Sequence, residues 1–144
     1  MSRRQQRELA VFRRTVVVVD DDPRVRQSLD SLLSSAGIEV RIFSSGGQVL
    51  ESDALADAGC LITDVRMPGM NGWELFRSTV ATHPLLHVIF VTAHQDDDAL
   101  RRALDGGAFA FLYKPFDGEE LLGTVEAAFK SNQPGSSTPD LTGL

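Results

Sequence analysis

Polar side chains that could bind a metal ion and a phosphate follow four apolar runs of this sequence. Asp20, Asp21 and Asp22 come directly after the β-branched run 16–19, and neighbouring carboxylates beside a buried strand repel one another unless a cation compensates their charge. The other runs, 60–63, 88–91 and 109–113, end at Asp64, Thr92 and Lys114. Acids that hold a cation, with a hydroxyl and an ammonium that hold an anion, suit phosphate chemistry assisted by a divalent metal.

The elements that would position these side chains alternate between strand and helix patterns. Five such alternations predict a parallel sheet covered by helices on both faces. The carboxyl ends of its strands share one edge, so the polar side chains should meet there. Asp22 and Pro23 are typical of a helix start, so Asp22 is expected to cap that helix rather than bind the metal. Residues 38–43 predict the second strand, and the charges of Glu39 and Arg41 favour an edge position for it.

Four stretches of the chain carry a family resemblance. They are Val-Val-Asp-Asp-Asp-Pro-Arg-Val-Arg from Val18, Thr-Asp-Val-Arg-Met-Pro-Gly-Met-Asn-Gly from Thr63, Val-Thr-Ala-His from Val91, and Lys-Pro-Phe from Lys114. In this order and spacing the chain, over residues 15–130, resembles the receiver domain of two-component response regulators. The wording around Asp64 and Lys114 is most similar to FixJ-like regulators. The resemblance implies a flavodoxin-like, doubly wound α/β fold with five parallel strands in the order 2-1-3-4-5 and five helices.

The resemblance also implies a metal-dependent phosphoacceptor. Asp64 would take a phosphoryl group from a histidine kinase or a histidine phosphotransfer protein. Asp21 would be the more direct Mg²⁺ ligand and Asp20 a further one, directly or through water. An oxygen of Asp64 and the backbone carbonyl of Arg66 would complete the protein ligands. Mg²⁺ keeps several waters, so few protein ligands suffice.

Other residues would bind the phosphoryl group or respond to it. Thr92 and Lys114 match the family's phosphoryl-binding positions, and the peptide bond between Lys114 and Pro115 is often cis in the family. Phe111 matches its switch aromatic, although a plain core aromatic would show the same pattern. Arg66 and His94 match positions that in the family influence the rate of dephosphorylation.

Lys114 has support from composition as well. The chain has only two lysines against twelve arginines, yet a lysine stands at this strand end. A compact ammonium binds a phosphoryl oxygen as a point charge where a guanidinium fork would not fit.

Bulk properties limit the other functions. With 144 residues the chain is expected to hold a basic extension at 1–14, one domain at 15–130 and a Gly/Ser/Pro-rich tail or linker at 131–144. A net charge of −6 argues against direct nucleic-acid binding. A single cysteine and no apolar stretch of membrane-spanning length predict a cytoplasmic protein. It is expected to catalyse only its own phosphorylation and dephosphorylation.

Three alternatives stay open at this stage. The chain could be the N-terminal part of a FixJ-like DNA-binding regulator, or a pseudo-receiver that only binds proteins. A haloacid-dehalogenase-like phosphatase would explain the Asp-x-Asp of Asp20 and Asp22, but it would leave Asp64 without a role. For the receiver, phosphorylation is expected to change the surface of the fourth helix, strand 109–113 and the last helix. That change would promote a homodimer or the binding of a separate effector.

Overall fold

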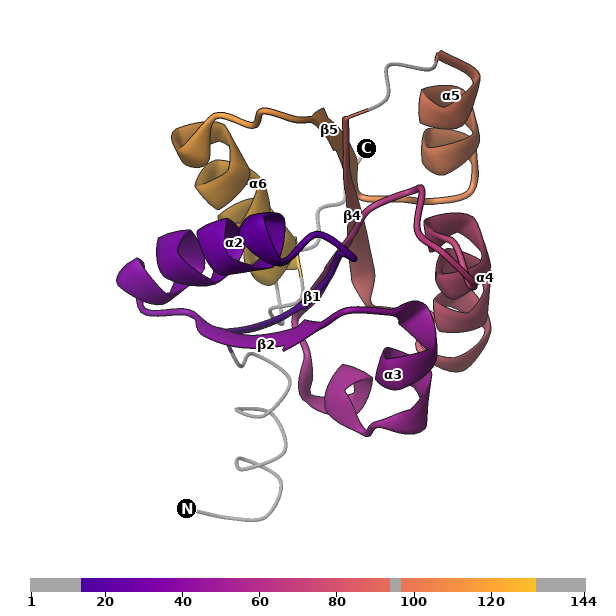
Figure 1. Cartoon of the computed structure of the whole chain (residues 1–144), viewed down its shortest axis with the longest axis horizontal. Helices are drawn as coiled ribbons and strands as arrows, with labels where there is room; N and C mark the ends of the chain where they lie inside the picture. Colours follow the sequence, from indigo (N-terminus) through magenta and orange to yellow (C-terminus); the bar gives the residue numbers. More distant parts are fainter. Residues whose placement is uncertain (1–13, 94–96, 132–144) are drawn as a thin grey trace, which may run out of the picture.

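Five parallel strands form one sheet in the order β2-β1-β3-β4-β5, as the family resemblance implies (Figure 1). The structure is a computed structural model that describes residues 14–93 and 97–131. The strands are β1 (Thr15–Val19), β2 (Glu39–Phe43), β3 (Cys60–Thr63), β4 (His87–Thr92) and β5 (Ala110–Tyr113). The second strand lies at an edge as expected and begins one residue later than predicted. The predictions for His94, for residues 1–13 and for residues 132–144 lie outside the described residues.

Helices cover both faces of the sheet (Figure 1). α2 (Pro23–Ser35) and α6 (Gly118–Ser131) pack on one face, and α3 (Gly46–Glu51), α4 (Gly72–Thr82) and α5 (Asp97–Asp105) pack on the other. A short 3₁₀ turn, η1 (Ala54–Asp57), leads into β3. None of the described helices is long and apolar enough to cross a bilayer.

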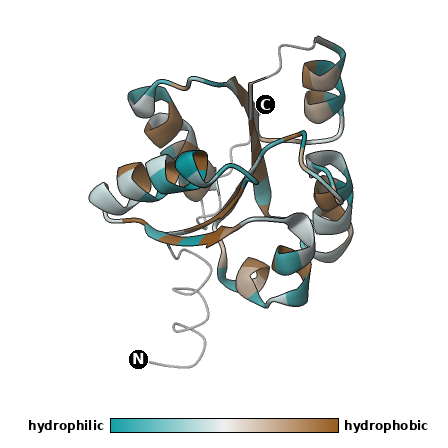
Figure 2. Cartoon of the chain, viewed as in Figure 1, coloured by the Kyte–Doolittle hydropathy of each residue, from teal (hydrophilic) through white to brown (hydrophobic). Residues whose placement is uncertain are grey.

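Alternate residues of β1 point into two separate apolar cores. Val17 and Val19 pack with α3 and α4, whereas Val16 and Val18 pack with α2 and α6. All four valines are at most 1% exposed, which explains why the run is uniformly apolar rather than alternating. Figure 2 shows the inner strands of the sheet largely in hydrophobic colours, whereas the helices around them carry both hydrophobic and hydrophilic residues.

The turn from β1 to α2 forms as the sequence predicts. The Asp22 side chain caps α2 by accepting a hydrogen bond from the Arg24 amide at 2.9 Å, and Pro23 occupies the first turn. The helix buries Leu29 and Leu33, and Gly37 at φ +79° then turns the chain toward β2. The acidic segment 20–22 is therefore held between a buried strand and a capped helix.

A close backbone contact at Gly72 supports the β3 end of the same edge. The Gly72 amide donates a hydrogen bond to the Val65 carbonyl at 2.8 Å. A Cβ on Gly72 would lie 2.1 Å from the carbonyl oxygen of Asp64. Only glycine lets α4 begin this close to the segment that carries Asp64.

Gly72→Ala should therefore lower the free energy of unfolding by about 3 kcal/mol, because the Asp64 backbone must move to admit the methyl group. Urea denaturation measures this loss. Gly123→Ala is the matched control, since the exposed Gly123 of α6 has open space around its missing Cβ. That control should gain about 0.5–1 kcal/mol. Equal effects of the two substitutions would contradict the close contact.

Candidate functional site

The carboxyl ends of four strands meet at one edge and bring the predicted site residues together. Asp20 follows β1, Asp64 follows β3, Thr92 ends β4 and Lys114 follows β5. Asp20, Asp64 and Thr92 are each at most 8% exposed. The Lys114 amide donates to the Thr92 carbonyl at 2.7 Å, so backbone pairing continues past β5 and places the lysine beside the end of β4.

Lys114 lies at the centre of this edge. Its ammonium donates to Oδ2 of Asp20 at 2.7 Å and to Oδ2 of Asp64 at 2.8 Å. Burial of the ammonium acts to lower the pKa of Lys114, but its hydrogen bonds and charge interactions with the two aspartates outweigh that effect. The pKa of Lys114 is therefore raised, and the lysine stays charged at neutral pH. The peptide bond between Lys114 and Pro115 is cis, as the resemblance implies.

Asp20 is the most deeply buried carboxylate of the site. Its side chain is 2% exposed, and its Oδ1 accepts a hydrogen bond from the Asp22 amide at 2.9 Å. Burial raises the pKa of Asp20, and the nearby charge of Asp64 acts in the same direction, against the hydrogen bonds from Lys114 and Asp22. This carboxylate thus gains from any further cation placed beside it.

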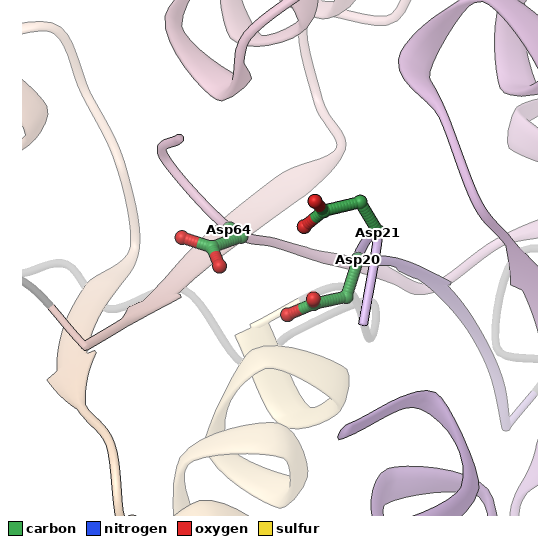
Figure 3. Close-up of side chains that lie close together, drawn as sticks. All are labelled: Asp20, Asp21 and Asp64. Carbon is green, nitrogen blue, oxygen red and sulfur yellow. The ribbon is translucent and has the colours of Figure 1, made fainter. Parts of the chain in front are cut away.

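The three aspartates Asp20, Asp21 and Asp64 fit a divalent cation. One carboxylate oxygen of each can be chosen so that all three lie within 4.8 Å of one another. Figure 3 shows the Asp20 and Asp21 side chains leaving the chain on the side that faces Asp64. Asp20 and Asp64 are buried and Asp21 is exposed, so the cluster is shielded from solvent at the first two residues and open to solvent at Asp21. Hard carboxylate oxygens with room for water are what Mg²⁺ prefers.

Arg66 contacts Asp64 through its backbone. Its amide donates to Oδ1 of Asp64 at 3.3 Å, while its side chain is exposed. The proposed metal contact of its carbonyl and its influence on dephosphorylation stay predictions.

Aromatic rings connect the site to α4, β4 and β5. Phe111 is half-buried and lies 5.9 Å from the ring of Phe90 and 5.3 Å from that of Tyr113. The ring of Trp73 lies 4.8 Å from that of Phe90, and the Arg102 guanidinium lies 5.3 Å from the Trp73 ring. A cavity of about 580 Å³ is lined by residues of α5 and of the site edge together, among them Arg66, Trp73, Thr92 and Arg102. These ring contacts are compatible with Phe111 as a switch aromatic and as a plain core aromatic, so its switch role stays a prediction.

Two supporting residues escaped the sequence analysis. Gly72 allows the close approach beside Asp64, and Arg26 of α2 donates from Nη1 to the Asp20 carbonyl at 2.7 Å. Each stands at the end of one of the stretches that carry the family resemblance. Their position in those stretches was the available signal, but their contacts depend on packing between elements.

Comparisons with known proteins agree with this geometry. The family model described as the response regulator receiver domain matches residues 16–126. The DNA-binding transcriptional regulator NtrC of Escherichia coli K12 is 43% identical over 118 residues, which are 82% of this chain and 25% of NtrC. The response regulator protein TodT of Pseudomonas putida is 38% identical over 130 residues, which are 90% of this chain and 57% of TodT.

Solved structures give the same result. The apo receiver domain of nitrogen regulatory protein C superposes with a TM-score of 0.72 at 43% identity, covering 80% of this chain and 93% of that one. The response regulator StyR superposes with a TM-score of 0.75 at 43% identity, covering 82% of this chain and 60% of that one.

The fold, the clustered side chains and these matches define the class: the chain belongs to the response regulator receiver domain family of two-component systems. It spans about a quarter of NtrC and just over half of TodT. The matches do not single out FixJ-like regulators, so that finer resemblance stays a prediction. Membership in the receiver family leaves the phosphatase alternative without support.

Lys114→Met should lower the free energy of unfolding at neutral pH by about 3 kcal/mol, because it leaves two buried carboxylates facing each other without their cation. Chemical denaturation of the metal-free protein measures the effect. Lys130→Met, at the exposed end of α6, removes the chain's other lysine and should cost less than about 1 kcal/mol. Similar losses in both variants would show that the Lys114 ion pairs contribute little.

Proposed function

We propose that this chain accepts a phosphoryl group on Asp64 from a histidine kinase or a histidine phosphotransfer protein, in a Mg²⁺-dependent reaction in the cytoplasm. The observation that carries the proposal is the position of Asp64. Its carboxylate lies 2.8 Å from the Lys114 ammonium, and its oxygens belong to the cluster formed with Asp20 and Asp21. Among the described residues this is the one cluster of three or more candidate metal-ligating side chains.

In this reaction the phosphoryl group passes from an imidazole nitrogen of the donor histidine to a carboxylate oxygen of Asp64. An Asp64 oxygen attacks phosphorus, a new O–P bond forms, and the N–P bond to the donor imidazole breaks while that nitrogen keeps the electron pair. The Lys114 ammonium offsets charge on the transferred group, and the Thr92 hydroxyl donates a hydrogen bond to one of its oxygens. Bound Mg²⁺ would neutralise further charge on the phosphoryl oxygens and on Asp64. Hydrolysis of the resulting acyl phosphate ends the signal, so the protein turns over only its own phosphoryl group.

The similarity to NtrC and TodT supports a role within a larger signalling system. NtrC is named as a DNA-binding transcriptional regulator, and the present chain corresponds to about a quarter of it. With a net charge of −6 the chain is not itself suited to binding nucleic acid. We therefore place its output in protein contacts of the face made by α5, β5 and α6, where Arg101, Arg102 and Asp105 are exposed. A phosphorylation-dependent homodimer through this face stays a prediction.

Asp64→Asn should abolish labelling of the protein by acetyl phosphate, since the amide is a poor nucleophile. Phosphate incorporation followed by mass spectrometry gives the answer. Asp53→Asn, which changes a carboxylate that is 96% exposed, is the control and should label at the wild-type rate. Undiminished labelling of Asp64→Asn would refute the assignment of the acceptor.

Mg²⁺ should stabilise the folded protein, because folding gathers the three aspartates into one cluster. At concentrations 10 to 100 times its dissociation constant, the gain should be about 1–3 kcal/mol. Asp21→Ala should remove most of this gain without lowering the stability of the metal-free protein, because its exposed carboxylate adds to the repulsion within the cluster. Thermal melting with MgCl₂, against NaCl at equal ionic strength, separates binding from screening. A melting temperature unmoved by Mg²⁺, with full phosphorylation in EDTA, would contradict the metal site.

A further inference from the structure

Arg26, near the start of α2, contacts the acidic segment 20–22 through both its backbone and its side chain. Its backbone amide donates to the Asp22 carbonyl at 3.1 Å, as the first turn of the helix requires. Its guanidinium reaches back and donates from Nη1 to the Asp20 carbonyl at 2.7 Å. One side chain therefore fixes the end of β1 relative to the start of α2.

This hydrogen bond completes the anchoring of Asp20. The Asp20 amide donates to the Phe43 carbonyl at 3.2 Å. Its carboxylate oxygens accept from the Asp22 amide at 2.9 Å and from Lys114 at 2.7 Å. With the carbonyl held by Arg26, every polar group of Asp20 has a protein partner.

The hydrogen bond from Arg26 to the Asp20 carbonyl also constrains the next residue, Asp21. The Asp20 carbonyl belongs to the peptide unit that joins it to Asp21, and that unit is planar. A hydrogen bond to the carbonyl therefore sets the plane from which the Asp21 side chain departs. Among the described residues the exposed Asp21 carboxylate makes no hydrogen bond or ion pair of its own, so the orientation of its backbone is its main constraint.

We propose that Arg26 is a positioning residue that orients Asp21 toward the metal site, an inference that rests on the proposed Mg²⁺ dependence. Charge and geometry predict opposite results at this position. A guanidinium repels Mg²⁺, so a purely electrostatic effect would make a neutral replacement bind the metal more tightly. Loss of the positioning hydrogen bond makes the same replacement bind it more weakly.

The test is the Mg²⁺ affinity of Arg26→Met, measured by isothermal titration calorimetry with MgCl₂ on protein shown to be folded by circular dichroism. Methionine is unbranched and favours helix, so α2 should be retained. Affinity should fall about tenfold, the scale at which residues that orient metal ligands act. The Mg²⁺ concentration for half-maximal labelling by acetyl phosphate should rise by the same factor, while the rate at saturating Mg²⁺ stays within about twofold of wild type. Should Arg26→Met fail to fold, Arg26→Gln, with a shorter uncharged side chain, makes the same comparison.

Two further variants separate positioning from charge. Arg24→Met removes a positive charge from the same helix, where the Arg24 side chain is 90% exposed, and should leave Mg²⁺ affinity unchanged or slightly raised. In an Asp21→Ala background, adding Arg26→Met should have little further effect, because its target is gone. Unchanged or tighter binding by Arg26→Met, or a full tenfold effect in the Asp21→Ala background, would overturn the inference. A wild-type protein that neither binds Mg²⁺ nor takes phosphate would instead overturn the proposed function.

Discussion

The ammonium of Lys114 lies between two buried carboxylates, and the edge of the sheet is organised around this contact. Asp20 and Asp64 end neighbouring strands, so the parallel sheet itself brings their negative charges together. Without a cation each would raise the free energy of the other in its charged form. Lys114, delivered from two strands further along the sheet, supplies that cation at 2.7 Å and 2.8 Å. The ion pairs thus connect three strands that do not all pair with one another.

The neighbouring contacts make this arrangement specific. Gly72 admits the backbone of α4 to within contact of Asp64, and Arg26 holds the carbonyl of Asp20. These two contacts act on the backbone of the acidic residues and use none of their carboxylate oxygens. Because the backbone of these residues is fixed, the site can keep its geometry when a ligand binds to its carboxylates.

The same arrangement leaves unfavourable electrostatic interactions among the carboxylates, and a bound cation would reduce them. Burial raises the pKa of Asp20, and the exposed Asp21 carboxylate adds negative charge at the open side of the cluster. A divalent cation would offset both, and together with the Lys114 ammonium it would balance the charge of the three carboxylates, which lowers the repulsion that an incoming phosphoryl group would meet. The cavity of about 580 Å³ beside Thr92 and the rings around Phe90 lie next to this centre. A change of charge at Asp64 would therefore occur close to packed side chains of α4, α5 and β5.

The local sequence pattern was enough to predict the strands and the residues at their ends. Apolar runs define strands by local burial, and polar residues after each run mark the shared edge, so Asp20, Asp64 and Lys114 could be placed from pattern alone. The order of the strands came from the family resemblance carried by those motifs. The capping role of Asp22 was equally local. The tertiary structure decided what depends on distances between elements: the bonds of Lys114 to two aspartates, the contact of Gly72 with Asp64, and the reach of Arg26 to Asp20. The aromatic partners of Phe111 belong with these. A side chain's type and spacing specify which element it lies on, whereas its partner across the fold is fixed only when strands and helices pack together.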